Sequence, residues 1–266
     1  MKVLIPTDFS NYSEATILCA LNDLKRIDSE AILMHVIEFD PELIDSFAGV
    51  TFDKARDELE KRAKEKLEEL VKRFESAGIK ARYIEPYIGD PVVEIVKKAE
   101  EEKVGLIMIG ARGKGLSRKL KIILGSVSEG VLEASSVPVL ITKFKVEGGV
   151  CQTIEGSLFS RVLYAFDFSS QSKELLNYLK RFPIENIVAS HVAESEEMDL
   201  DFIERIKKEY PSAKVFIKAG KVGKVIIDTA KELNATLIAI GAGVERIGSV
   251  TTHVVRNSDV SVLVYK

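Results

Sequence analysis

The sequence is poor in the residues on which several classes of protein depend. Its two cysteines, Cys19 and Cys151, cannot build a disulfide framework, so a reduced, cytoplasmic setting is expected. Its three histidines leave little room for a histidine-based metal site, and we assign no metal ligands. No apolar stretch approaches the ~20 residues that span a bilayer, and Pro6 and Asp8 come too early for a signal peptide.

A strong excess of charge of one sign is also absent. The chain has 38 Lys and Arg against 41 Asp and Glu, which gives a net charge of -3. Proteins that bind nucleic acids usually carry a basic excess instead. We therefore predict neither a nucleic acid nor a membrane as a partner. With 46% hydrophobic and 30% charged residues, the chain has the composition of a globular protein.

What the sequence does contain is four pairs of similar segments in the same order. The pairs include an Asp-Phe-Ser near the start of each copy and a Gly-Ser-Val near its end, which makes a chance match a poor explanation. The paired segments are residues 2–10 and 161–169, 35–36 and 191–192, 89–110 and 220–241, and 125–143 and 248–266. The repetition predicts two copies of one fold.

The second copy is the shorter one. About 25 residues are missing between His191 and Gly220, and eight between Gly241 and Gly248. The 266 residues are about 1.8 times the ~150 typical of one domain. We predict a first domain over residues 1–145, a linker over 146–159 and a shortened second domain over 160–266.

Apolar runs alternate with helical patterns within each copy. The runs at 3–5, 31–36, 106–109 and 139–141 predict strands. An apolar stripe predicts a helix over 55–74, whose charged residues between 54 and 72 are expected to form a solvated face, and Asp90-Pro91 opens another over 92–103. Such alternation is typical of an α/β fold with a doubly wound parallel sheet, in which ligands bind at the carboxyl ends of the strands.

The first candidate site residues, Thr7 and Asp8, follow the first predicted strand. A hydroxyl and a carboxylate at the carboxyl end of a strand suit hydrogen bonds to a sugar or a base. The alternative is structural, because Asp8 or Ser10 could cap the helix that begins near Tyr12.

A glycine-rich and basic segment, residues 110–128, follows the predicted strand over 106–109. Its glycines let a phosphate approach the backbone, and Gly125-Ser126 opens a helix whose N-terminus attracts anions. The alternative is a capping box of Ser126 and Glu129, with the basic side chains in solvent. The segment contains no acid and five basic residues, which favours an anionic ligand: Arg112, Lys114, Arg118, Lys119 and Lys121. Neither the P-loop motif nor a complete G-x-G-x-x-G occurs in it.

Together, Asp8, the Gly110-x-x-Gly113 loop, Gly125-Ser126 and a closing V-P-V-L strand resemble a universal stress protein domain. Because the match runs through both copies, the whole chain resembles a tandem universal stress protein. The ATP-binding branch of that family is described by G-2x-G-9x-G-(S/T). Here 11 residues separate Gly113 from Gly125, so this loop is two residues longer.

The resemblance implies two Rossmann-like, adenine nucleotide alpha hydrolase-like domains that form a pseudo-dimer through their last strands, 139–142 and 262–265, and a homodimer is a further expectation. It implies an adenine nucleotide (ATP, ADP or AMP) as ligand, with Mg²⁺ carried by the phosphates. The residues implied at the ribose and adenine are Thr7, Asp8, Val36, Ile109 and Gly110, and those at the phosphates are Arg112, Gly113, Gly125, Ser126 and Val127.

The second copy departs further from this pattern. Asp167, Val192 and Gly241 persist, but most of the glycine loop is lost, so a nucleoside, a monophosphate or no ligand is expected there. His35 and His191 are predicted to pack rather than to bind.

The expected function is that of a non-enzymatic regulator or sensor in a stress response. In it, the nucleotide orders the basic loop over 114–121 for an unknown protein partner, and no catalytic residue is assigned. The alternatives are a slow ATPase or nucleotidyl transferase that uses the same site, and a flavin-binding electron-transfer module.

Overall fold

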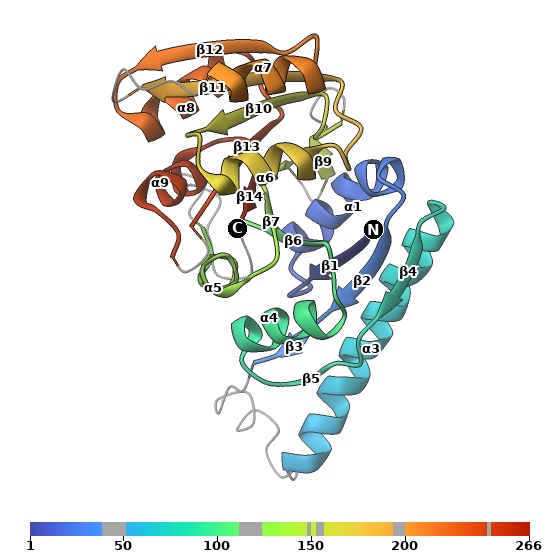
Figure 1. The fold of residues 1–266 in the computed structure, drawn as a ribbon. Coiled ribbons are helices and arrows are strands. Elements are labelled where there is room, and N and C mark those ends of the chain that lie inside the picture. The colour runs from blue at the N-terminus through green and yellow to red at the C-terminus, as the bar shows by residue number, and fades with distance from the viewer. Residues whose placement is uncertain (39–51, 112–123, 148–149, 153–156, 194–199, 244–245) are drawn as a thin grey trace.

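The computed structural model describes residues 1–38, 52–111, 124–147, 150–152, 157–193, 200–243 and 246–266 (Figure 1). Strands and helices alternate along both halves of the chain. The first half contains β1 (Lys2–Pro6), α1 (Asn11–Arg26), β2 (Glu30–Met34), β3 (Val36–Ile37), α3 (Phe52–Ser76), β4 (Lys80–Tyr83), β5 (Tyr87–Ile88), α4 (Pro91–Glu101), β6 (Leu106–Gly110), α5 (Ser126–Ala134) and β7 (Val139–Thr142).

After β8 (Lys145–Glu147) and β9 (Val150–Gln152), which form a small antiparallel sheet, the second half repeats the alternation. It contains β10 (Arg161–Phe166), α6 (Ser170–Leu179), β11 (Asn186–Ala193), α7 (Leu200–Glu209), β12 (Lys214–Ala219), α8 (Val222–Glu232), β13 (Leu237–Gly241), α9 (Ser249–Asn257) and β14 (Ser261–Tyr265). The predicted strands and the two predicted helices are all present, with ends that differ by up to three residues.

The main sheet has ten strands in the order β12-β11-β10-β13-β14-β7-β6-β1-β2-β4. Each half contributes five parallel strands in the same relative order, with its first strand in the middle. The halves join where β14 pairs antiparallel with β7, with Leu263 opposite Leu140. The predicted α/β class and the pseudo-dimer through the last strands are therefore confirmed.

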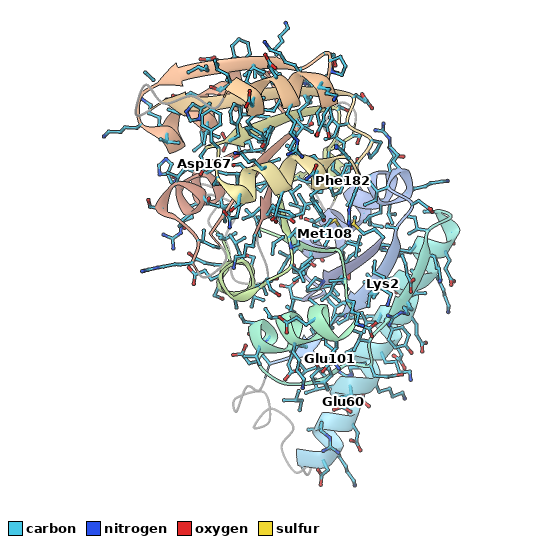
Figure 2. All side chains as sticks on the ribbon, viewed as in Figure 1. Lys2, Glu60, Glu101, Met108, Asp167 and Phe182 are labelled. Atoms are coloured by element: carbon cyan, nitrogen blue, oxygen red, sulfur yellow. The ribbon has the colours of Figure 1, made fainter. Side chains whose placement is uncertain are left out.

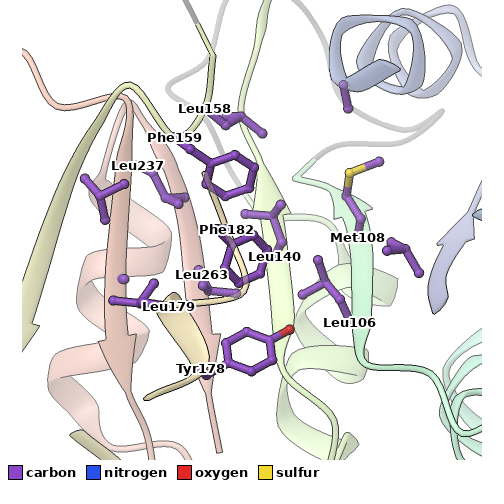
Figure 3. Packing of buried hydrophobic residues seen from close by; sticks show 14 of the residues in the cluster. Leu106, Met108, Leu140, Leu158, Phe159, Tyr178, Leu179, Phe182, Leu237 and Leu263 are labelled. Atoms are coloured by element: carbon purple, nitrogen blue, oxygen red, sulfur yellow. The ribbon is translucent and has the colours of Figure 1, made fainter. Parts of the chain in front are cut away.

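The core consists of two apolar layers, one on each face of the sheet, because successive strand residues point to opposite faces. In β1, Val3 and Ile5 belong to one layer and Leu4 to the other. Between the halves, the first layer continues without a break, and Tyr178 and Phe182 pack there beside β7 and β14 (Figure 3).

Two lysines tie the halves together in a reciprocal way. Lys143, which follows β7 and is 3% exposed, donates from Nζ to the carbonyl oxygens of Val255 and Ser258 at 2.5 and 2.6 Å. These carbonyls lie at the carboxyl end of α9 in the other half. Lys266, which follows β14, donates to the carbonyl oxygen of Glu133 at 2.6 Å, in the last turn of α5. A cation at this end of a helix offsets the helix dipole.

The segment that leads into the second half is anchored in the core. Asp23 on α1 is 6% exposed and accepts hydrogen bonds from the hydroxyl of Ser157 and from the amide of Leu158, the latter at 3.0 Å. Leu158 and Phe159 are each 2% exposed. The domain limits 1–145, 146–159 and 160–266 stay a prediction.

Candidate ligand-binding site

One cavity of about 780 Å³ lies in the first half, at the carboxyl ends of β1 and β6 and at the start of α5. We call it the first pocket. It has the size of a typical small-molecule site. Eight of the ten residues predicted to bind the ligand line it: Thr7, Asp8, Val36, Ile109, Gly110, Gly125, Ser126 and Val127. The other two, Arg112 and Gly113, lie outside the described residues, as does the basic loop over 114–121. The structure thus brings the described candidates together, and their role in binding stays a prediction.

The corner after β1 is fixed by short local hydrogen bonds. Ser10 is the N-cap of α1, because its hydroxyl accepts from the amide of Ser13 at 3.1 Å. Asp8 accepts from the amide of Ser10 at 3.0 Å, so it shapes the turn and does not cap the helix. The hydroxyl of Thr7 shares a hydrogen bond of 3.0 Å with that of Ser13 and accepts from the amide of Phe9 at 3.1 Å. Thr7 and Asp8 are therefore held at the pocket wall.

His35 has a packing role, as predicted, but it also lines the first pocket. Its Nδ1 lies 2.7 Å from the carbonyl oxygen of Thr7, and its ring centroid lies 4.3 Å from that of Phe9. Phe9 adopts a φ of 55°, which turns the chain between β1 and α1. His35 thus supports the corner that carries Asp8.

The start of α5 leaves its backbone donors open to the pocket. Gly125 is the N-cap and makes no side-chain cap hydrogen bond. Ser126 is exposed as the first helical residue, and Glu129 pairs with Arg256 of α9. The capping box of Ser126 and Glu129 is therefore wrong. Since the amides of a first helical turn have no partner within the helix, this N-terminus is suited to an anion.

Helix α3 supplies a pocket wall that we did not predict. Leu59, Arg62, Ala63 and Lys66 line the first pocket, although the charged residues of this helix were expected to form a solvated face. Lys66 places its Nζ 5.0 Å from the ring centroid of Phe9. A four-residue spacing, shared by Leu59 with Ala63 and by Arg62 with Lys66, was the available signal. The charged side chains of Arg62 and Lys66 are exposed, as expected, and they border the pocket because α3 runs along β2 and β4 (Figure 1).

A second cavity, of about 980 Å³, occupies the equivalent place in the second half, and we call it the second pocket. It lies at the ends of β10, β11 and β13 and at the start of α9, and its wall includes Asp167, His191, Val192 and Gly241. His191 is 9% exposed, and its Nδ1 lies 2.9 Å from the carbonyl oxygen of Phe166, as in the first half.

Asp167, which follows β10 (Figure 2), is engaged more tightly than a turn requires. It accepts from the amide of Ser169 at 3.1 Å and from the hydroxyl of Ser172 at 2.7 Å. Partial desolvation raises the pKa of Asp167, but the hydrogen bonds from Ser169 and Ser172 outweigh it and hold the pKa below its usual range.

Among the described residues, no three His, Cys, Asp or Glu side chains gather as they would around a metal ion. No described helix is both long enough and apolar enough to cross a bilayer.

Comparison with known proteins gives a consistent picture. A model of the Universal stress protein family matches residues 1–143 and 188–266. Over 159 residues, 54% of this chain, the sequence is 36% identical to Universal stress protein MJ0577 of Methanocaldococcus jannaschii, 95% of which is covered. The crystal structure of a universal stress protein from Archaeoglobus fulgidus covers 100% of this chain and 98% of its own, with a TM-score of 0.80 and 36% identity. A functionally unknown protein, PA1789 from Pseudomonas aeruginosa, shares the fold, with a TM-score of 0.63 at 15% identity over 99% of this chain and 91% of its own.

Proposed function

The chain belongs to the universal stress protein family, and from that premise we propose that its first half binds an adenine nucleotide in the first pocket. The observation that carries the proposal is the open start of α5. From Ser126 on, α5 presents its N-terminal amides to a cavity that Thr7 and Asp8 also line. Amides at one end suit phosphates, and a hydroxyl with a carboxylate at the other suits a ribose and a base.

The roles divide along the pocket. Ser126 and Val127 bind the phosphates through their amides and the exposed hydroxyl of Ser126. Gly125, whose own amide donates to the carbonyl oxygen of Ala111 at 2.8 Å, lets the phosphates approach the backbone. Ile109 and Gly110, at the end of β6, line the ribose, and the buried Val36 contacts the adenine. By resemblance to the family, Arg112 and Gly113 border the phosphates.

A magnesium ion would reach the pocket on the nucleotide. The described residues offer no cluster of metal ligands, which fits an ion carried by the phosphates and not by the protein. Arg62 and Lys66 add positive charge to the wall that α3 forms.

The bound nucleotide would act as a signal. Its phosphates would attract the basic side chains of residues 114–121 and order that loop, so that a protein partner meets a changed surface in a stress response. A cytoplasmic location and a homodimer stay predictions. The alternative of a slow ATPase or nucleotidyl transferase stays a hypothesis. A nucleotide that is released intact and in one-to-one ratio with the protein would count against it.

The identity of the ligand can be read directly. Mass spectrometry of the material released on denaturing the purified protein should find ATP, ADP or AMP, and a flavin would contradict the proposal. Calorimetry with Mg-ATP should then give one site per chain.

A pair of matched variants tests the phosphate site. Gly125 and Gly248 are the N-caps of α5 and α9, and both have room for a side chain, since a Cβ would come no closer than 3.4 Å to any neighbour at Gly125 and would meet nothing within 4 Å at Gly248. Gly125→Asp places a carboxylate where the phosphates would bind, and we expect affinity for ATP to fall roughly 100-fold or more.

The control variant, Gly248→Asp, makes the same change in the second half and should leave ATP binding unchanged. Both variants should gain a few tenths of a kcal/mol of stability, because Asp is a better N-cap than Gly. A loss of binding therefore cannot be attributed to unfolding. Wild-type affinity in Gly125→Asp would sink the assignment.

A further inference from the structure

The second pocket contains a buried hydroxyl without a partner. Ser190 on β11 is 1% exposed, and its Oγ makes no hydrogen bond to any described residue. It lines the second pocket. Along β11 it alternates with residues of the opposite face, so its side chain points to the same side as Val192, which also lines the pocket. A buried hydroxyl without a partner is costly, and its position against a cavity indicates that a ligand supplies the partner.

Two strand residues that line the second pocket are smaller than their counterparts in the first half. In the repeat, Ser190 corresponds to Met34, and Ala165 corresponds to Pro6. Ala165 and Ser190 are register partners on adjacent strands, as Pro6 and Met34 are in the first half. Smaller side chains at both positions are consistent with the larger volume, about 980 Å³ against 780 Å³.

The charge of the two walls also differs. Arg62, which pairs with Glu58 at 2.8 Å, and Lys66 line the first pocket together with Asp8 and Glu38, whereas no Lys or Arg is among the described residues that line the second. Asp167, the one carboxylate among the described lining residues, already accepts two hydrogen bonds. Apolar side chains line the cavity at Val192, Ile226 and Ile240, and polar ones at Gln171, Ser249 and Thr251.

We infer that the second pocket is a binding site for an uncharged, nucleoside-like ligand, in which Ser190 hydrogen-bonds a ring heteroatom. The apolar side chains would hold a flat ring, and Asp167 at the rim would accept from a sugar hydroxyl. The choice of a nucleoside rests on the proposed function of the first pocket, because the two cavities are copies. Gly248 opens α9 on this pocket as Gly125 opens α5 on the first, but no Lys or Arg among the described lining residues would offset the charge of a triphosphate, so we expect the triphosphate in the first pocket alone.

Adenosine is the probe that tests this site. Calorimetric titrations with adenosine, with and without saturating Mg-ATP, would compare wild type with Ser190→Met, which restores the side chain of the first half. We expect wild type to bind one adenosine per chain in the presence of ATP and Ser190→Met to bind none. Without ATP, Ser190→Met should bind one adenosine fewer than wild type.

Two milder variants separate the hydroxyl from the fold. Ser190→Ala should bind adenosine about tenfold more weakly in the presence of ATP, the worth of one hydrogen bond. It should unfold at no lower temperature than wild type, since the lost hydroxyl has no protein partner. Thr229→Ala is the control, because Thr229 is equally buried and unpartnered but does not line the pocket. It should bind adenosine as wild type does.

The two proposals fail in different ways. If the protein binds no ATP, the function proposed for the first pocket is wrong. The titrations without ATP then still test the second pocket, because they compare Ser190→Met with wild type. Equal adenosine binding in wild type and Ser190→Met overturns the second site. Two ATP molecules per chain would overturn its uncharged ligand.

Discussion

The two halves carry the same corner after their first strand and connect it differently. In the first half, the hydroxyl of Ser13 pairs with that of Thr7 at 3.0 Å. In the second half, Phe166 stands in place of Thr7, and Ser172, the counterpart of Ser13, donates to Asp167 at 2.7 Å. One substitution next to the strand end thus redirects a hydroxyl from a neighbouring side chain to the carboxylate that faces the pocket.

The same contrast extends to the walls of the pockets. The buried Met34 of β2 does not line the first pocket, to whose wall helix α3 adds Arg62 and Lys66. Its counterpart Ser190 lines the second pocket, whose described lining residues include no cation. Both copies keep the same strands and helix starts, while a few side chains set the size and charge of each cavity. A shortened copy can thus still carry a pocket.

The largest expected effect concerns the reciprocal lysines. Lys143→Met leaves two buried helix carbonyls without their donor and should lower the free energy of unfolding by about 3 kcal/mol. Lys266→Met removes one bond near the surface and should cost less than about 1 kcal/mol. Urea denaturation measures both. Equal losses of unfolding free energy would show that the two lysines contribute alike, contrary to their difference in burial.

A smaller effect is expected from the wall that α3 adds. Arg62→Ala and Lys66→Ala should each weaken ATP binding about three- to tenfold at low salt, and the loss should shrink as salt rises, because both side chains are exposed. Affinity for adenosine in the presence of ATP should not change. The matched control is Lys72→Ala on the same helix, since Lys72 does not line the first pocket. A loss independent of salt would contradict an electrostatic role.

The smallest effects concern two aspartates whose pKa values move in opposite directions. Burial raises the pKa of Asp23 above 3.8, so the folded protein binds that proton more tightly and stability falls as the pH rises through the raised pKa. The pKa of Asp167 is lowered, so its contribution is present above about pH 4 and is lost as the pH falls through the lowered pKa.

Denaturation curves from pH 3 to pH 8 separate these contributions. Asp23→Asn should remove the fall in stability with rising pH. Asp167→Asn should cost less than about 1 kcal/mol at pH 7, because solvent screens the exposed carboxylate, and almost nothing at pH 3. If both substitutions changed the pH dependence of the unfolding free energy in the same direction, the opposite pKa directions of Asp23 and Asp167 would be ruled out.

The repeated sequence carried enough information for the fold and for one end of the site. Period and turn residues predict the strands, and because they occur twice in the same order, the pairing of the last strands follows. Thr7, Asp8 and Gly125 could be found because they stand directly at strand or helix ends. Arg62 could not be placed in this way, since its contact depends on how a long helix lies across the sheet.

The sequence also gives no sign of which buried polar side chains have a hydrogen-bond partner. In the sequence, Ser190 is one small residue in an apolar strand, and only the packing around it shows that its hydroxyl has no partner among the described residues. Lys143 likewise gives no sign of its two carbonyl partners, which come from the other half more than 100 positions away.

The most direct test of the account is the number of Mg-ATP molecules bound per chain at saturation, measured by calorimetry on nucleotide-free protein. We expect one Mg-ATP molecule per chain, whose binding is lost in Gly125→Asp and retained in Gly248→Asp and Ser190→Met. Two per chain, or one that survives Gly125→Asp and disappears in Gly248→Asp, would contradict the assignment of the phosphate site to the first half.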